Sequence, residues 1–213
     1  MAQARNRYKT APRQQTLAGC FDYSFQFLPD DAKQLFPKLR LFAAPFLAEF
    51  VEEIFDAPDA SQTLNLLWLK SMVRAIPFAV DTPLYFLHPT ARWYAGVVGD
   101  ALGGVPIEQE YGAKYGEIYA RLARAAYQSF GGKTDVATVQ LAHVSVPDLM
   151  QARKFLDDKE RSEQDFLLAY LLRVFGDMTT AQNLLDESKQ LAEKGGYARH
   201  QSLTLNEMAN IFV

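Results

Sequence analysis

The second half of this chain consists of helix-forming stretches separated only by short breaks. From residue 108 onward the pattern predicts helices over 108–130, 135–144, 146–158, 161–175, 179–194 and 198–213. The breaks fall at Gly131-Gly132, Pro147, Gly176-Asp177 and Gly195-Gly196. Because a short connection leaves no room for a long crossover, we expect successive helices to be antiparallel neighbours in a bundle or a solenoid.

The first half mixes helices with two short strands. Apolar spacing predicts helices over 16–27, 31–42 and 61–76, with a short helix over 47–55. Asp30 and Ser61 are the expected N-caps. Two strands are expected over 77–80 and 84–87, with Pro77 at a strand start or on an edge, and a helix begins at Pro89. Helices, a two-stranded wing and a further helix are the order of a winged-helix domain.

The C-terminal helices contain a faint internal repeat. The pattern of Leu168-Ala169 and Leu172 before the turn at Gly176-Asp177 resembles a tetratricopeptide (TPR) unit. Met208-Ala209 and Phe212 repeat the start of that pattern about forty residues later. Stacked repeats bury their apolar faces only against each other, so we expect this array to be incomplete, and its uncovered apolar surface favours self-association.

The predicted fold class is mainly α, divided into four segments. They are a basic arm or truncated linker at 1–15, a winged-helix domain at 16–103, a helical bundle at 104–160 and incomplete TPR-like helices at 161–213. The bundle is expected to run into the partial solenoid, and Gly103-Gly104-Val105-Pro106 closes the winged-helix domain.

Composition excludes several classes of protein. The 213 residues carry a formal net charge of −3, which argues against capture of nucleic acid by overall charge. No apolar run reaches the ~20 residues of a membrane span, and the polar N-terminus is no secretory signal. The single cysteine, Cys20, excludes an internal disulfide and suits a reducing compartment, so the expected location is cytoplasmic.

Catalytic and metal-binding patterns are missing from the sequence. His88, His143 and His200 are isolated from one another and from Cys20, without the spacing of zinc ligands. No G-x-S-x-G nucleophile motif occurs. We therefore expect no catalytic residue, no metal site and no enzymatic activity.

Four stretches resemble a known family, and the first of them is Arg13-Gln-Gln-Thr-Leu17. Asp22-Tyr-Ser-Phe-Gln-Phe-Leu-Pro29, the helix 32–43 and above all Leu87-His88-Pro89-Thr90-Ala91-Arg92 are similar to the winged-helix domain of STAND (NB-ARC-type) signalling ATPases. The helices after residue 108 look like the linker that joins this domain to repeats in that family. The resemblance implies that His88 is a cofactor-binding residue, which contacts the β-phosphate of a bound ADP. It departs from the family at Pro89, where the motif often has Asp.

The P-loop that such an ATPase requires is not found. Gly132-Lys133-Thr134 matches the end of G-x-x-x-x-G-K-[ST], but Tyr127 stands where the first glycine belongs. We therefore expect no cofactor to be bound by this chain alone; ADP or ATP would be reached only through a partner P-loop domain. The implied function is a non-catalytic regulatory and interaction fragment, in which the winged helix senses ADP and the TPR-like helices bind a partner protein.

Other interpretations remain open. His88 has a simpler role as a helix N-cap. The whole chain is alternatively a stand-alone TPR-like protein-interaction module, or a winged-helix DNA-binding regulator. DNA binding is disfavoured because Lys70 and Arg74 are the only cations of the expected recognition helix, 61–75. Several residues are expected to be structural only. Cys20, Phe36, Phe42, Trp68 and Trp93 are assigned to the core, and His143 and His200 to the surface or to satisfied packing.

Overall fold

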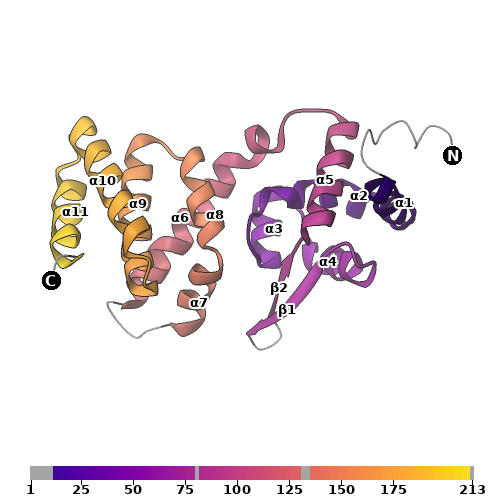
Figure 1. Ribbon diagram of the computed structural model, residues 1–213, viewed down its shortest axis with the longest axis horizontal. Coiled ribbons are helices and arrows are strands. Elements are labelled where there is room, and N and C mark those ends of the chain that lie inside the picture. Colours follow the sequence, from indigo (N-terminus) through magenta and orange to yellow (C-terminus); the bar gives the residue numbers. More distant parts are fainter. Residues whose placement is uncertain (1–11, 80–81, 131–134, 212–213) are drawn as a thin grey trace. The chain divides into compact units, whose positions relative to one another are not determined.

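The computed structural model describes residues 12–79, 82–130 and 135–211. Most of these residues are helical, and the strands form one two-stranded antiparallel sheet, which confirms the mainly α prediction (Figure 1). The chain divides into two compact units, Met1–Val105 (unit 1) and Pro106–Val213 (unit 2), each of which is described by itself. Residues 1–11 of the expected arm, the Gly132-Lys133-Thr134 motif and Phe212 lie outside the described residues.

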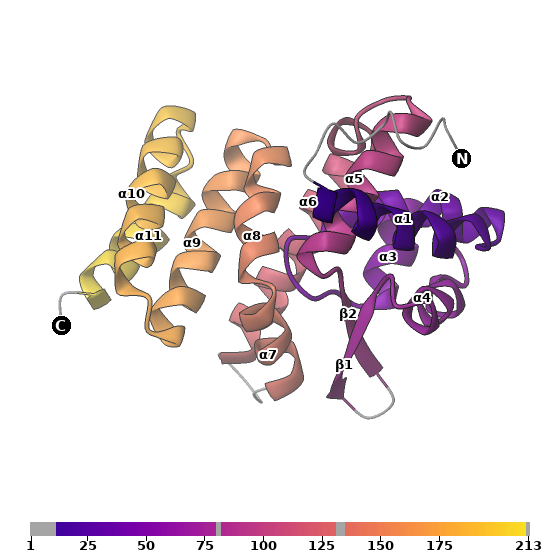
Figure 2. The same ribbon diagram turned by 45° about the vertical axis from the view of Figure 1, so that its right-hand side comes forward.

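Unit 1 consists of helices around a β-hairpin. Its elements are α1 (Pro12–Gln26), α2 (Asp30–Lys38), the 3₁₀ turn η2 (Leu39–Leu41), α3 (Ala48–Phe55), α4 (Ala60–Leu69), β1 (Arg74–Ala79), β2 (Thr82–Phe86) and α5 (Pro89–Leu102). Figure 2 shows the two strands side by side as a hairpin that projects beyond the helices of unit 1. Phe46 extends this sheet by an isolated bridge, exchanging both backbone hydrogen bonds with Tyr85 at 2.8 Å.

The core of unit 1 is aromatic and aliphatic. Phe36, Phe42, Phe46 and Tyr94 have no exposed surface, and Phe42 stacks on Phe46 with ring centroids 4.1 Å apart. Leu35, Phe36, Leu39 and Phe42 are all buried, as predicted, but α2 ends at Lys38 instead of residue 42, so Leu39 lies in η2 and Phe42 follows it. The apolar periodicity was therefore sufficient to orient this helix.

Some predicted boundaries in unit 1 are wrong. Helix α1 begins at Pro12, inside the expected arm, and Asp30 is the first residue of α2 rather than its N-cap. Helix α4 has its N-cap at Asp59 instead of Ser61, and it ends at Leu69 instead of running to residue 76. Strand β1 then starts at Arg74, so Pro77 lies within it, opposite Pro83. A proline is tolerated there because a strand of a two-stranded sheet is always an edge strand.

Unit 2 contains only helical elements among its described residues. They are α6 (Ile107–Phe130), α7 (Val136–Val144), α8 (Val146–Ala152), the 3₁₀ turn η3 (Arg153–Phe155), α9 (Asp158–Phe175), α10 (Met178–Gly195) and α11 (Ala198–Ile211). Helices α9, α10 and α11 follow one another as neighbours in both views (Figures 1 and 2). The expected boundary between residues 160 and 161 falls inside α9, whose N-cap Asp157 closes a capping box with Glu160.

The turns of unit 2 match the breaks in the sequence. Gly176 and Gly196 adopt left-handed conformations, with φ of 93° and 68°, at the C-caps of α9 and α10. Gly112 allows α6 to approach η3 closely, because a Cβ atom there would lie 2.4 Å from Cδ1 of Phe155. Asp135 caps α7 through its side chain, as the predicted start of that helix requires.

Candidate functional site

His88 lies at the junction between strand β2 and helix α5. Strand β2 leads into Leu87, which is buried, while His88 itself is exposed. His88 is the N-cap of α5, and Pro89 occupies the first helical position. The sequence therefore folds locally so that an imidazole stands in solvent at the positive end of a helix of fourteen residues.

The contacts of the His88 ring decide which nitrogen faces outward. Its Nδ1 lies 2.9 Å from Oγ1 of Thr90 and 3.4 Å from the backbone nitrogen of Thr90. Because the backbone N–H of Thr90 can only donate, Nδ1 acts as the acceptor, the Thr90 hydroxyl donates to it as well, and the proton of the neutral ring is assigned to Nε2. The cap thus leaves Nε2–H as the donor with which His88 can reach an oxygen of another molecule.

Helix α5 is held firmly beneath His88. The Tyr94 hydroxyl, which is fully buried, donates to Oδ1 of Asp22 at 2.7 Å, and the Tyr94 ring stacks on Phe21 at 5.1 Å. Arg92 donates from Nη1 to the carbonyl of Arg40 at 3.2 Å. These contacts join α5 to α1 and η2, so the position of the His88 backbone is set by several elements of unit 1.

A shallow depression runs along the exposed side of α5 from the turn that follows His88. Trp93, expected in the core, is only half-buried and lies on this surface. The lining residues are Pro89, Arg92, Trp93, Gly96, Val97 and Asp100. Asp100 is paired with Arg40 at 3.0 Å. The depression is therefore lined by the apolar Trp93 ring and by a carboxylate whose charge is already neutralised.

Helix α4 does not have the charge of a DNA-reading helix. Its exposed positions include Ser61, Gln62 and Asn65, and the cations Lys70 and Arg74 lie beyond its last residue. Because phosphate contacts supply most of the affinity for a duplex, several Lys or Arg side chains are needed on one face. The geometry therefore gives no further support to the DNA-binding alternative.

The remaining singled-out residues have mixed outcomes. Cys20 and Trp68 were predicted to be buried and are exposed, so both predictions are wrong. His143 is on the surface as expected, with its ring 4.4 Å from that of Phe175. The Nδ1 atom of His200 is buried without a hydrogen-bond partner in the described structure, so the expectation of satisfied packing is wrong for it.

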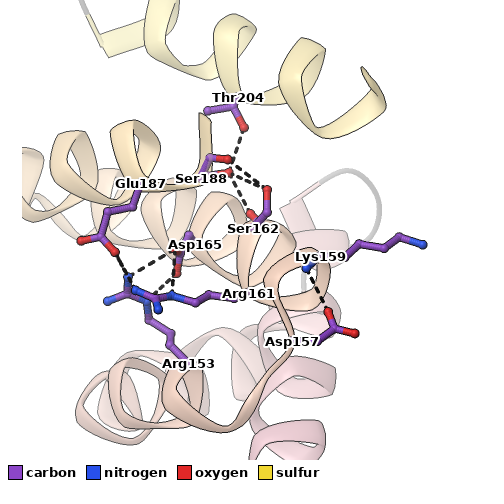
Figure 3. A network of polar contacts seen from close by, with 9 residues as sticks. All are labelled: Arg153, Asp157, Lys159, Arg161, Ser162, Asp165, Glu187, Ser188 and Thr204. Atoms are coloured by element: carbon purple, nitrogen blue, oxygen red, sulfur yellow. Dashed lines mark hydrogen bonds and ion pairs between the residues drawn. The ribbon is translucent and has the colours of Figure 1, made fainter. Parts of the chain in front are cut away.

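Sequence reasoning missed a buried polar network in unit 2 (Figure 3). Asp165 has no exposed surface and pairs with Arg153, which also pairs with Glu187. Burial raises the pKa of Asp165 to about 6, against the opposing effect of Arg153. Asp165 lies three residues before Leu168 and seven before Leu172, which places it on the apolar face of α9. This helical spacing is the sequence signal from which its burial could have been predicted.

A second buried carboxylate lies between α6 and α8. Asp148 has no exposed surface and accepts a hydrogen bond from the Tyr115 hydroxyl at 2.6 Å. Burial, followed by the charge of Asp148, raises the pKa of the neighbouring Tyr119. No group of three or more His, Cys, Asp or Glu side chains with metal-binding geometry occurs in 12–79, 82–130 and 135–211.

Comparison with known proteins gives one structural match. Neither a protein-family model nor a curated protein matches this chain. The match is the crystal structure of a STAND protein with a tetratricopeptide repeat sensor from Pyrococcus horikoshii, at 15% identity and a TM-score of 0.34. It covers 96% of this chain, which spans 37% of that protein. A TM-score this low does not establish a common fold. None of the described helices is long and apolar enough to cross a bilayer.

Proposed function

We propose that this chain is a non-catalytic regulatory part of a STAND-type signalling ATPase, working in a reducing, cytoplasmic compartment. Unit 1 acts as a winged-helix domain whose His88 contacts ADP held by a separate P-loop domain. Unit 2 acts as a linker and a TPR-like surface that binds a partner protein. The observation that carries the proposal is the exposed His88 ring, with Nδ1 engaged by Thr90 and Nε2–H directed to no described residue.

The local electrostatics favour a phosphate at this position. The first turn of α5 places the positive end of the helix dipole beside His88, while Pro89 has no N–H and the N–H groups of Thr90 and Arg92 are used by the cap. An imidazole N–H at the same place adds one directed hydrogen bond, strengthened when its acceptor is charged. Because Tyr94 and Arg92 fix α5 in unit 1, a contact made by His88 would transmit the presence of ADP to the whole unit.

The order of elements supports the winged-helix assignment. Helices α2, α3 and α4 precede the β1–β2 hairpin, and the bridge at Phe46 adds a third short segment to that sheet. In unit 2, the short connection at Gly176-Asp177 makes α9 and α10 an antiparallel pair. Ala169 and Ala181, both fully or almost fully buried, supply small side chains to this pair, as a TPR-like unit requires.

The test follows release of a fluorescent ADP analogue, mant-ADP, from a complex of this chain with the P-loop ATPase that co-purifies with it. His88→Ser keeps an N-cap oxygen but cannot reach a phosphate, so it should accelerate release about tenfold through loss of one charge-assisted hydrogen bond. The chain alone should not bind mant-ADP. An unchanged release rate in an intact complex, or the absence of any P-loop ATPase among its partners, would contradict the proposal.

A further inference from the structure

A groove with an apolar floor lies within unit 2. It has a volume of about 670 Å³ and is bounded by α6, α9 and the start of α11. Phe166 and Leu167 lie at its floor with 6% and 4% of their surface exposed, and Tyr127 meets Phe166 edge-on at 5.7 Å. A groove of this size and lining suits a short apolar segment of another molecule.

Positive charge gathers around this floor. Arg124, Lys159 and Arg199 line the groove, while Glu163 is the carboxylate among its lining residues. This enrichment runs against the composition of the chain, whose formal net charge is −3. The groove is therefore locally cationic in a protein that is acidic as a whole.

The carboxylate is already neutralised from within the groove. Arg124 donates from Nε and Nη2 to the two oxygens of Glu163, both at 3.1 Å. The Arg124 hydrogen bond is the main cause that lowers the pKa of Glu163, and the charges of His200 and Arg199 lower it further. Glu163 therefore stays ionised and remains paired with Arg124.

Two cations are left without such a partner. The side chains of Lys159, in the first turn of α9, and of Arg199, in the first turn of α11, make no salt bridge or hydrogen bond within the described ranges; the backbone N–H of Lys159 donates to Asp157. In Figure 3 the Lys159 side chain extends away from the polar network of α9 and α10. Both side chains are exposed, which is typical of the rim of a protein interface rather than of a closed pocket for a small anion.

We propose that this groove binds an acidic segment of a partner protein. An apolar side chain of the segment covers Phe166 and Leu167, and its flanking carboxylates pair with Lys159 and Arg199. Complementary charge argues for this occupant, since the two unpaired cations come from different helices, α9 and α11, that line one groove with an apolar floor. The inference rests on the partner-binding part of the proposed function and is independent of ADP.

The test measures fluorescence anisotropy of a short capped peptide with a neutral dye, in which phenylalanine is flanked by glutamates. The full chain should bind it about tenfold more tightly than the matched peptide with glutamine in place of glutamate. Raising salt from about 0.05 M to about 0.5 M should weaken binding of the acidic peptide only. Equal affinity for the two peptides, or no binding of either, overturns the inference.

Variants of the chain locate the binding. Lys159→Gln and Arg199→Gln should each weaken binding of the acidic peptide about fivefold. Lys154→Gln removes an exposed charge from η3, outside the groove, and should leave the affinity unchanged. If the chain instead forms a dimer in sedimentation that Lys159→Gln or Arg199→Gln dissociates, a second copy is the occupant and the inference is wrong.

Failure of this inference is distinguishable from failure of the proposed function. His88→Ser should leave peptide affinity unchanged, because the peptide site lies wholly in unit 2. If His88→Ser accelerates ADP release but the chain does not bind the acidic peptide, only the inference about the groove is wrong. The reverse pattern contradicts only nucleotide sensing.

Discussion

Both units bury aromatic rings, but among the described residues only unit 2 also buries polar and charged side chains. In unit 1 the fully buried residues include Phe36, Phe42, Phe46 and Tyr94. In unit 2 the residues without exposed surface include the polar Asp148, Ser162, Asp165, Ser188 and Thr204. Aromatic packing is strong and tolerant of small shifts, whereas hydrogen bonds between helices require one register.

The difference fits the roles proposed for the two units. Unit 1 must hold one exposed histidine on a fixed base, and a dense apolar core does this. Unit 2 must keep α6, α9 and α11 at the spacing that forms a groove. Ser162 on α9, Ser188 on α10 and Thr204 on α11 form a continuous ladder of hydroxyl contacts that sets the spacing of α9 and α11 through α10 (Figure 3).

The largest effect should come from Phe42→Ala. Removing a fully buried ring that stacks on Phe46 should lower the free energy of unfolding of unit 1 by about 4 kcal/mol. Both tryptophans of the chain, Trp68 and Trp93, belong to unit 1, so fluorescence during urea unfolding reports on that unit. Far-UV circular dichroism reports on both units. An equal shift of the two transitions would show that the units unfold together. The two units would then have one common free energy of unfolding, and their stabilities could not be compared.

The next effect should be a pH dependence carried by Asp165. Its pKa in the folded chain, about 6, exceeds its ordinary value of 3.8, so the folded state binds the proton more tightly. The contribution of Asp165 to stability should therefore fall as pH rises from about 4 to about 6, by up to about 3 kcal/mol. Asp165→Asn, which cannot ionise, should lack this loss.

Urea unfolding followed by circular dichroism at about pH 4.5, near the lower end of that window, and at about pH 7.5, above it, measures most of the effect. Relative to the natural chain, Asp165→Asn should be more stable at the higher pH than at the lower one. The opposite trend would mean that pairing with Arg153 outweighs burial of the carboxylate. Unit 2 would then be held by charge attraction rather than by shape and hydrogen bonding.

The sequence predicted the apolar part of this contrast and missed the polar part. Leu35, Phe36, Leu39 and Phe42 were found because apolar residues at helical spacing determine which side of a helix is buried. Asp165 was missed because apolar periodicity assigns a charged residue to the solvent side of a helix. Burial of the Asp165 carboxylate depends on its partner Arg153, which lies in another element. Local pattern predicts which faces are apolar, but pairing between elements follows from the tertiary arrangement.

The candidate sites show the same limit. His88 was found from its place between a strand and Pro89, and the capping interpretation is confirmed by its contact with Thr90. Trp68 was wrongly placed in the core because it lies on the exposed side of α4 with Leu69, while Leu64 and Leu67 form the buried side. The groove cations Lys159 and Arg199 are forty residues apart in the chain, so only the packing of α9 and α11 brings them to one site.

A smaller effect should come from Ser188→Ala. The Ser188 hydroxyl donates to the carbonyl of Ser162 at 2.8 Å and lies 3.0 Å from Oγ1 of Thr204. Its loss should lower the stability of unit 2 by about 1 kcal/mol, because buried groups lose a partner. Circular dichroism should detect the shift while tryptophan fluorescence stays unchanged. Ser202→Ala, on the exposed side of α11, is the matched control, and an equal effect there would remove the hydroxyl ladder as a cause.

The smallest effect should come from His88, and it separates its two roles. His88→Ala removes the cap of α5 and should lower the stability of unit 1 by about 0.5–1 kcal/mol, as loss of an N-cap does. His88→Ser restores a capping oxygen and should recover most of that stability, measured by tryptophan fluorescence in urea. If both variants release mant-ADP at the same raised rate while only His88→Ala is destabilised, the phosphate contact is independent of the cap. If release follows stability instead, His88 acts only through the position of α5, and unit 1 carries no sensor of its own.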